Sequence, residues 1–334
     1  MSGFSLTRST RASRIAGVVA LVLLVVLAAA PWWAGSAFLH LAGEFAVYLA
    51  LASLWNLLAG YTGLVSVGQQ AYVGLGGYLT FCLALFFGVN PVLAVPLAGL
   101  AAAALAIPVA GLVFRLQGAY FAIGSWVIAE VFRLIAAQAT VLGGGSGISL
   151  PAQVTKQLGG KWLREASIFW LALALGAGCL GLVYLLLRSR IGLALTAIRD
   201  SEVASASLGI RIGRVKLVLY VIVAGLTAMI GALISLQKLR VSPDASFSVN
   251  DWTAFVIFIV VIGGIGTIEG PIIGTIVYFL LREFLADYGT IYLLFLGSLA
   301  IVVMLAAPKG LWGWVQGRFG WSLFPVGYRI HFKD

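Results

Sequence analysis

The sequence predicts an all-α polytopic membrane protein with eight to ten transmembrane helices, and three observations support this prediction. Hydrophobic residues make up 62% of the 334 positions and charged residues only 10%, whereas soluble proteins contain roughly 25% charged residues. A chain of this composition would expose too much apolar surface in water, so we expect lipid to be its solvent. Long uninterrupted apolar runs, rather than the alternation of barrel strands, predict helices as the spanning elements.

Ten apolar runs are candidates for these helices, because a helix needs about 20 apolar residues to cross the hydrocarbon core. The runs cover approximately residues 15–30, 42–60, 69–89, 91–114, 119–139, 167–187, 217–236, 252–268, 271–287 and 288–307. Run 69–89 is rich in glycine and polar residues, and run 271–287 contains Arg282 and Glu283. Either of these two weak runs could be re-entrant or broken, hence the range of eight to ten crossings.

The polar stretches between the runs are too short to hold a core of their own. Residues 1–334 therefore form a single transmembrane domain. At its N-terminus, Arg8, Arg11 and Arg14 precede the first apolar run. This pattern is shared by signal peptides, and Ala28–Ala30 would serve as a cleavage site. We expect instead a retained first span that ends at two interfacial tryptophans, Trp32 and Trp33.

The distribution of basic residues predicts the orientation by the positive-inside rule. With the N-terminus in the cytoplasm, ten crossings place the 188–216 loop and the 308–334 tail there as well. The 188–216 loop holds six basic residues against two acidic ones, a net charge of +4. The 237–251 loop is neutral and falls outside, and the 140–166 loop also falls outside although its net charge is +2.

The residue types that carry catalysis or metal binding are scarce. His40 and His331 are the only histidines, so no HExxH-type metal site can form. The glycines of Gly143–Gly147 lack the lysine of a phosphate-binding GxxxxGK[ST] loop. Cys82 and Cys179 lie within apolar runs and are expected to be small buried hydrophobes. We expect no enzyme activity, metal or cofactor in this chain, so energy for any transport must enter from another chain.

The formal net charge of +10 does not indicate nucleic-acid binding. The basic residues lie between apolar runs, and they form no stripe with interleaved exposed aromatic residues.

The cytoplasmic loop 188–216 contains an amphipathic segment. Ile191, Leu195 and Ile198 fall on one helical face. Two interpretations remain open for it: an interfacial connector whose arginines reach lipid phosphates, or a docking element for a soluble cytoplasmic partner.

A second short helix is expected to follow in the same loop. Asp200 and Ser201 can end the first helix and cap the next, which would run from Glu202 to Leu208 and stop at Gly209. Two short capped helices would form a rigid projection at the membrane surface.

Glycine and amide side chains are concentrated in the segment 56–80. It includes six glycines together with Asn56, Gln69 and Gln70. Such a segment permits close helix packing, or non-helical backbone beside a water-filled cavity. The first interpretation makes the segment structural, and the second makes its amides contacts along a translocation pathway.

Glu130 and Arg133 are spaced i, i+3 in the run 119–139, so they share a helix face. A lone charge at the bilayer centre costs about 3 kcal/mol, which favours an ion pair or a wet cavity. The two residues form either a structural ion pair or a contact for substrate or gating. Glu269 belongs to a tight turn between helices near the cytoplasmic face, and Ala224, Ala228 and Ala232 form a small-residue packing face.

Four motifs carry a resemblance to a known family. They are LWNLLAGYTGLVSVGQQAYVGLGGYL, LQGAYFAIGSWVIAEVFRLI followed by GGGSGI, RSRIGLALTAIRDSEVASASLGI, and GGIGTIEGPIIGT. In this order they resemble the branched-chain amino acid ABC transporter permease family, and they match best its LivM-like subunits. The resemblance covers about residues 50–287. The sequence departs from many relatives at Gln69 and Gln70, so no substrate contact is assigned there by analogy.

The resemblance implies the fold of an ABC importer permease in the bacterial inner membrane, with both termini cytoplasmic. It implies a second related permease subunit, two cytoplasmic ATPase subunits that bind ATP and Mg, and a periplasmic solute-binding protein. It also implies that the loop is the element coupled to an ATPase. The residues of that coupling element are Ile191, Leu195, Ile198, Arg199, Asp200, Glu202 and Gly209.

Two alternatives to a branched-chain amino acid importer remain open. Urea and short-chain amide importers use similar permeases. A proton-coupled secondary transporter with Glu130 as its proton carrier would need no docking loop.

Overall fold

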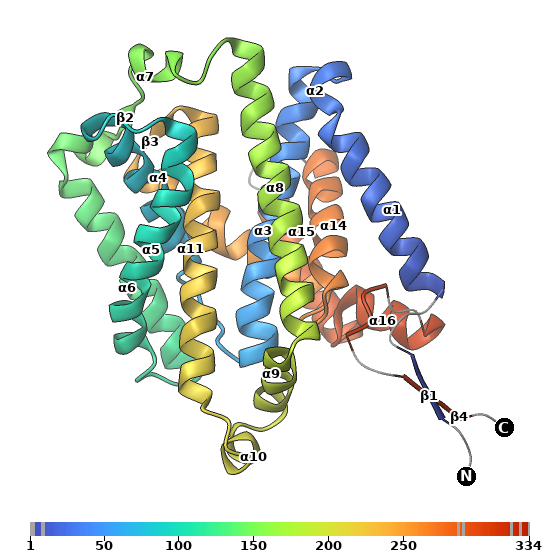
Figure 1. Ribbon diagram of the computed structural model, residues 1–334. Helices are drawn as coiled ribbons and strands as arrows, with labels where there is room; N and C mark the ends of the chain where they lie inside the picture. The colour runs from blue at the N-terminus through green and yellow to red at the C-terminus, as the bar shows by residue number, and fades with distance from the viewer. Residues whose placement is uncertain are drawn as a thin grey trace.

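In the computed structural model the chain forms a bundle of long helices packed side by side (Figure 1). The structure describes residues 4–7, 11–285, 288, 291–320, 323–326 and 329–332. The helices that match the ten apolar runs are α1 (Arg11–Ala28), α3 (Ser36–Thr62), α4 (Gln69–Phe86), α5 (Pro91–Val113), α6 (Ala119–Gln138), α8 (Lys161–Arg188), α11 (Ile212–Lys238), α13 (Phe255–Gly263), α14 (Glu269–Leu285) and α15 (Ile291–Ala306).

Other helices and strands connect these helices. They are β1 (Phe4–Thr7), α2 (Ala30–Trp33), η1 (Thr140–Leu142), η2 (Gly144–Ser146), β2 (Ile148–Ser149), α7 (Ala152–Lys156), α9 (Arg190–Asp200), α10 (Glu202–Ser207), β3 (Arg240–Val241), α12 (Pro243–Ser246), the π-helical turn η3 (Asn250–Ala254), α16 (Gly310–Phe319) and β4 (Arg329–Phe332).

Within the described residues, each of the ten predicted apolar runs contains a helix. In the same part of the chain, seven segments are long and apolar enough to cross a membrane: Ser36–Thr62, Pro91–Val113, Ala119–Gln138, Lys161–Arg188, Ile212–Lys238, Pro243–Gly263 and Leu293–Phe319. The all-α, multi-pass architecture is therefore confirmed. The remaining three helices, α1, α4 and α14, are too short or too polar to meet the same criterion. Two of them, α4 and α14, correspond to the runs predicted to be weak.

The two weak helices are held in the bundle by backbone-to-backbone packing at small residues. A Cβ atom on Gly76 of α4 would lie 1.8 Å from the carbonyl oxygen of Ala228 on α11. A Cβ atom on Gly274 of α14 would lie 1.9 Å from the carbonyl oxygen of Ile259 on α13. Neither position can accept a side chain, because the two backbones occupy that space. This is the close approach that small residues permit between membrane helices.

The predicted alanine face serves the same packing. Ala224, Ala228 and Ala232 on α11 are all buried. The two cysteines are free, Cys179 being buried and Cys82 partly buried.

The bundle has two ends with different connections (Figure 1). At one end lie α9, α10 and α16, together with both ends of the chain, which pair as the antiparallel strands β1 and β4. At the other end lie α2, α7 and the antiparallel pair β2–β3. We call these the α9 end and the α7 end. The 188–216 loop thus shares an end with both termini, and the 140–166 and 237–251 loops share the opposite end.

The predicted cytoplasmic tail contains a helix that packs against the bundle. Trp312 of α16 is buried, and Gly310 lies so close to Gly264 that a Cβ atom would be 2.4 Å from its Cα. Glu269, at the start of α14, accepts hydrogen bonds from the backbone N–H groups of Leu323 and Phe324 at 3.0 and 2.9 Å. This buried carboxylate therefore fastens the tail to the turn between α13 and α14.

The first helix is held against α8 by two tryptophans. The indole nitrogen of Trp170 donates to the carbonyl oxygen of Ala28 at 2.9 Å, and that of Trp162 donates to Pro31 at 3.0 Å. These contacts pack the first apolar run and α2 against α8.

Candidate functional site

The α9–α10 hairpin is a rigid projection because both of its helices are capped. The Ser189 hydroxyl accepts a hydrogen bond from the backbone of Ile191 at 3.2 Å, and the Ser201 hydroxyl accepts one from Ala204, also at 3.2 Å. Each serine satisfies an N–H group that a helix N-terminus leaves unpaired. Gly209 follows α10 with φ +82°, a conformation that glycine adopts without strain. The break at Asp200–Ser201 and the stop at Gly209 thus lie where the sequence predicts them.

The apolar face of α9 anchors the hairpin to the rest of the chain. Leu195 is fully buried and Ile198 is 2% exposed, whereas Ile191 at the start of the helix is 45% exposed. Gly192 lies against the last turn of α8, where a Cβ atom would be 2.1 Å from the carbonyl oxygen of Leu187. An amphipathic helix buries its apolar face against its own protein, so Leu195 and Ile198 are not accessible to a partner.

A second set of apolar side chains on the hairpin points to solvent. Leu193, Val203 and Leu208 are between 70% and 80% exposed. The sequence analysis missed them because their spacing forms no periodic stripe. The signal available was the presence of large apolar residues in a segment that is otherwise polar or small. Large apolar side chains that are exposed on a capped projection are candidates for an interaction surface.

Charged side chains tie the hairpin to neighbouring elements. Lys216 at the start of α11 contacts Glu202 at 2.5 Å. The Arg199 guanidinium lies over the ring of Tyr61, 5.9 Å from its centroid, and also contacts Asp200 at 3.3 Å. The cation–π contact holds the end of α9 against the end of α3, and the Lys216–Glu202 ion pair ties α10 to the start of α11.

Asn56 is a buried crosslink between α3 and the turn that precedes α14. Its side-chain nitrogen donates to the carbonyl oxygen of Thr267 at 2.7 Å, and its side-chain oxygen accepts from the N–H of Gly266 at 2.8 Å. Gly60, one turn further along α3, lies so close that a Cβ atom would be 2.6 Å from the Gly266 nitrogen. Arg199 borders the same turn, 3.7 Å from where a Gly266 Cβ would lie. The side-chain amide of Asn56 is therefore hydrogen-bonded to the backbone of a turn beside the hairpin, which fits the packing interpretation of this segment.

Gln69 and Gln70 are buried at the start of α4, and each has one unpaired polar atom. Gln69 donates to the carbonyl oxygen of Leu51 at 3.1 Å, while Gln70 accepts from the Thr253 hydroxyl. The structure records no partner for Gln69 Oε1 or Gln70 Nε2.

Gln69 borders a small cavity whose lining is mostly apolar and aromatic. Gln69 and Thr227, whose hydroxyl also lacks a recorded partner, both line a space of about 20 Å³. This volume holds one water molecule, and it is far too small for a solute pathway.

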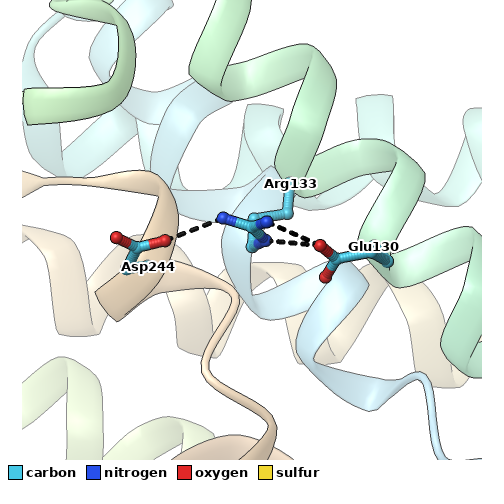
Figure 2. A network of polar contacts seen from close by, with 3 residues as sticks. All are labelled: Glu130, Arg133 and Asp244. Atoms are coloured by element: carbon cyan, nitrogen blue, oxygen red, sulfur yellow. Dashed lines mark hydrogen bonds and ion pairs between the residues drawn. The ribbon is translucent and has the colours of Figure 1, made fainter.

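Glu130 and Arg133 form an ion pair that extends to a third residue (Figure 2). Arg133 donates to Glu130 Oε1 from two nitrogens, at 2.9 and 2.6 Å, and its third nitrogen donates to Asp244 at 2.8 Å. Asp244 lies on α12, so this network joins α6 to the segment that follows α11. The side chains of Glu130, Arg133 and Asp244 are 45%, 29% and 83% exposed.

The five predicted pathway residues therefore occupy three separate places. Asn56 lies at the α9 end, the glutamines lie inside the core at the start of α4, and the Glu130–Arg133 pair lies beside α12 towards the α7 end. Asp244 is an addition that the sequence analysis did not single out, since it lies 111 positions from Arg133. In the described residues no group of three or more histidine, cysteine or acidic side chains could hold a metal ion.

Comparison with known proteins gives consistent results. The family described as "Branched-chain amino acid transport system / permease component" matches residues 37–307. The chain is 31% identical, over 87% of its length and 74% of the relative's, to the high-affinity branched-chain amino acid transport system permease protein LivM of Escherichia coli K12. It is 26% identical, over 80% of its length and 90% of the relative's, to a probable LivM of Methanocaldococcus jannaschii. No solved structure matches the chain.

Proposed function

Because this chain belongs to the family of branched-chain amino acid transport system permease components, we propose that it carries branched-chain amino acids through the membrane under the control of its α9–α10 hairpin. The chain is the permease subunit of an ABC importer, a multi-pass membrane protein that works in a complex with ATPases. Relatives named for branched-chain amino acid transport support this solute class. Urea, short-chain amides and proton-coupled transport through Glu130 have no comparable support.

In the proposed complex, other subunits bind ATP and deliver the solute. Membership of a permease family supports a non-catalytic role for this chain. Two cytoplasmic ATPases bind ATP and Mg, a second related permease completes the transmembrane pore, and a periplasmic protein delivers the solute. The α9 end faces the cytoplasm of a bacterial inner membrane, as the +4 charge of the 188–216 loop favours.

The hairpin is the proposed coupling element, and its exposed apolar residues are the observation that carries the proposal. Leu193, Val203 and Leu208 present apolar surface at the end of a capped projection. The buried side chains of Leu195 and Ile198 anchor α9 to the rest of the chain, so that the hairpin transmits a push from an ATPase as a rigid element. Ile191, Arg199, Asp200, Glu202 and Gly209 complete the element by capping it and tying it to α3 and α11.

Movement of the hairpin has a short route into the transmembrane region. Arg199 contacts Tyr61 on α3 and borders the turn at Gly266, which Asn56 fastens to α3. We propose that displacement of α9 shifts this turn, and with it α13 and α14. Asn56 then acts on transport through the turn, not by touching solute.

The Glu130–Arg133–Asp244 network is the proposed polar lining of the pathway. Charges in lipid are costly, yet all three side chains are partly or fully exposed in this chain. A water-filled path between this chain and a second permease would solvate them.

Co-purification with the ATPase partners tests the coupling role. In Val203→Asp/Leu208→Asp, we expect normal amounts of permease in the membrane but at least tenfold less ATPase retained, because two charges replace the apolar contact. Val141→Asp is the matched control, since Val141 is 69% exposed at the α7 end. Normal ATPase retention by the double variant would refute the assignment.

A further inference from the structure

A hollow between three helices at the α7 end takes no part in the function proposed above. It has a volume of about 210 Å³ and lies where α3 and α8 begin and α11 ends. Its apolar floor includes Leu39, Ile168, Phe169 and Ala172. Its polar lining is His40 from α3, Arg164 and Glu165 from α8, and Gln237 from α11. Drug-sized ligands occupy about 300–1,000 Å³, so this hollow suits a small polar group or one end of a larger molecule.

Glu165 supplies a negative charge with spare hydrogen-bonding capacity. Its side chain is 16% exposed. Its Oε2 accepts a hydrogen bond from the Ser36 hydroxyl at 2.8 Å, and Lys161 approaches its Oε1 only to 4.0 Å. An ionised carboxylate offers about four acceptor positions, so Glu165 can accept further donors from a ligand.

Arg164 supplies the matching positive charge. No acidic side chain in the described part of the chain pairs with it. A guanidinium group presents its N–H donors in a planar fork that fits the oxygens of a phosphate or carboxylate. Arg164 and Glu165 give the lining one positive and one negative charge, so a ligand with both charges and no net charge complements it.

The hollow lies at the level expected for lipid headgroups. Trp32 on α2 packs against Trp162 and Trp170 on α8, with ring centroids 6.4 and 5.5 Å apart. Trp162 is two residues from Arg164 in the same helix turn. Tryptophans concentrate at the membrane–water interface, so the charged lining belongs to that level.

The floor of the hollow is closed, which argues against a solute route through it. A Cβ atom on Gly43 of α3 would be 3.8 Å from Ala172 Cβ on α8, so the two helices are in contact there. This contact blocks a route between α3 and α8 at that point.

We propose that this hollow binds the headgroup of a zwitterionic aminophospholipid, with its phosphate on Arg164 and its ammonium group on Glu165. A free amino acid shares this chemistry, an ammonium group a few bonds from an oxyanion, and is the competing source. The interfacial level and the closed floor favour the lipid. The inference rests on the proposed function only in that α3, α8 and α11 cross the membrane.

Lipid retention by the full-length chain in its complex tests the assignment. The complex is placed in nanodiscs that contain equal parts of phosphatidylethanolamine, phosphatidylcholine and phosphatidylglycerol, and the lipids retained after release are counted by native mass spectrometry. We expect phosphatidylethanolamine to be retained about tenfold over the others, a ratio that corresponds to 1.4 kcal/mol. Choline lacks N–H donors for Glu165, and phosphatidylglycerol lacks the cation.

Two variants separate the contributions of the charges. Arg164→Gln should abolish the preference. Glu165→Gln, which keeps an acceptor for Ser36, should retain phospholipid but no longer distinguish phosphatidylethanolamine from phosphatidylcholine. Lys156→Gln is the control, because it removes an exposed charge at the same end outside the hollow. Thermal unfolding checks that each variant is folded.

The opposite outcomes are equally definite. Equal retention of the three lipids by the unmodified chain, or an unchanged preference in folded Arg164→Gln, overturns the proposal. Binding of radiolabelled leucine to delipidated protein, lost in Arg164→Gln, would identify the ligand as a free amino acid and also overturn it. None of these readouts depends on ATPase docking, so failure here is distinguishable from failure of the proposed function.

Discussion

Asn56 on α3 and Thr267 before α14 are 211 positions apart in the chain, yet the Asn56 amide donates to the Thr267 carbonyl oxygen at 2.7 Å. The same side chain accepts from the next backbone group, the N–H of Gly266. One buried amide therefore uses its donor and its acceptor to hold a turn against a helix. The turn at Gly266, which Arg199 of α9 borders, is thereby fastened to α3 and leads into α14.

Replacement of Asn56 should destabilise the protein by leaving backbone groups unpaired. In Asn56→Ala the Gly266 N–H and the Thr267 carbonyl lose their partner, and each unpaired buried group costs about 1–3 kcal/mol. Asn56→Asp keeps the acceptor for Gly266 but sets a carboxylate oxygen against the Thr267 carbonyl oxygen, so it should lose at least as much. The free energy of unfolding in mixed micelles measures both effects. Ser53→Ala is the control, since the Ser53 hydroxyl bonds only to Leu49 within its own helix; an equal loss in that variant would contradict the crosslink.

Two leucines of the hairpin, two positions apart, should respond in opposite ways. Leu195 is fully buried and Leu193 is 70% exposed. Leu195→Ala should lower the free energy of unfolding by about 2–5 kcal/mol, as core truncations do. Leu193→Ala should change it by less than about 0.5 kcal/mol while reducing the retention of the ATPase. Unfolding and co-purification, measured on the same preparations, test the pair. A Leu193→Ala protein that is destabilised but still retains its ATPase would reverse the assignment.

A methyl group added at the contact between α4 and α11 should be poorly tolerated. In Gly76→Ala the new atom collides with backbone of Ala228, and overpacking costs typically about 1–3 kcal/mol. Gly181→Ala on α8 is the matched control, because no heavy atom of the described residues lies within 4 Å of its Cβ position. The midpoint of thermal unfolding in detergent compares the two. Equal midpoints would mean that the two helices lie further apart.

Neutralising Glu130 should alter the rate of transport without altering solute preference. Glu130→Gln weakens the ion pair, while Arg133 keeps its contact with Asp244. Exposed ion pairs contribute up to about 1 kcal/mol, so the change in stability should stay within that range. Uptake of leucine, isoleucine and valine into proteoliposomes should fall in the same proportion. A changed order of preference among the three would show that Glu130 contacts the solute.

The sequence predicts those features that depend on local pattern. Ten apolar runs became ten helices in the described residues, because apolar length alone determines where a helix can cross lipid. The caps at Ser201 and Gly209 follow from side-chain and backbone chemistry within a few residues. Glycine density predicted close packing at α4, although it could not name Ala228 as the neighbour.

Features that depend on contacts across the chain could not be predicted. Periodicity identified the face of α9 at Leu195 and Ile198, but it cannot say whether the protein itself or a partner covers that face. For Asn56 the sequence left both close packing and a pathway contact open, and its amide is occupied by a turn more than 200 residues away. The contact between Asp244 and Arg133 could not be predicted either, because only the folded chain brings α12 next to α6.

The packing of α4 against α11 also limits which movements can accompany transport. The carbonyl oxygen of Ala228 occupies the place of a side chain at Gly76, and the carbonyl oxygen of Val73 lies 2.0 Å from the Cβ position of Gly231. At Gly76 and at Gly231 the backbone of one helix fills the space of a missing side chain on the other. Neither α4 nor α11 can therefore slide or rotate against the other without a steric clash. These two helices must travel together as one unit, and any opening and closing of the permease has to occur at the boundaries of that unit.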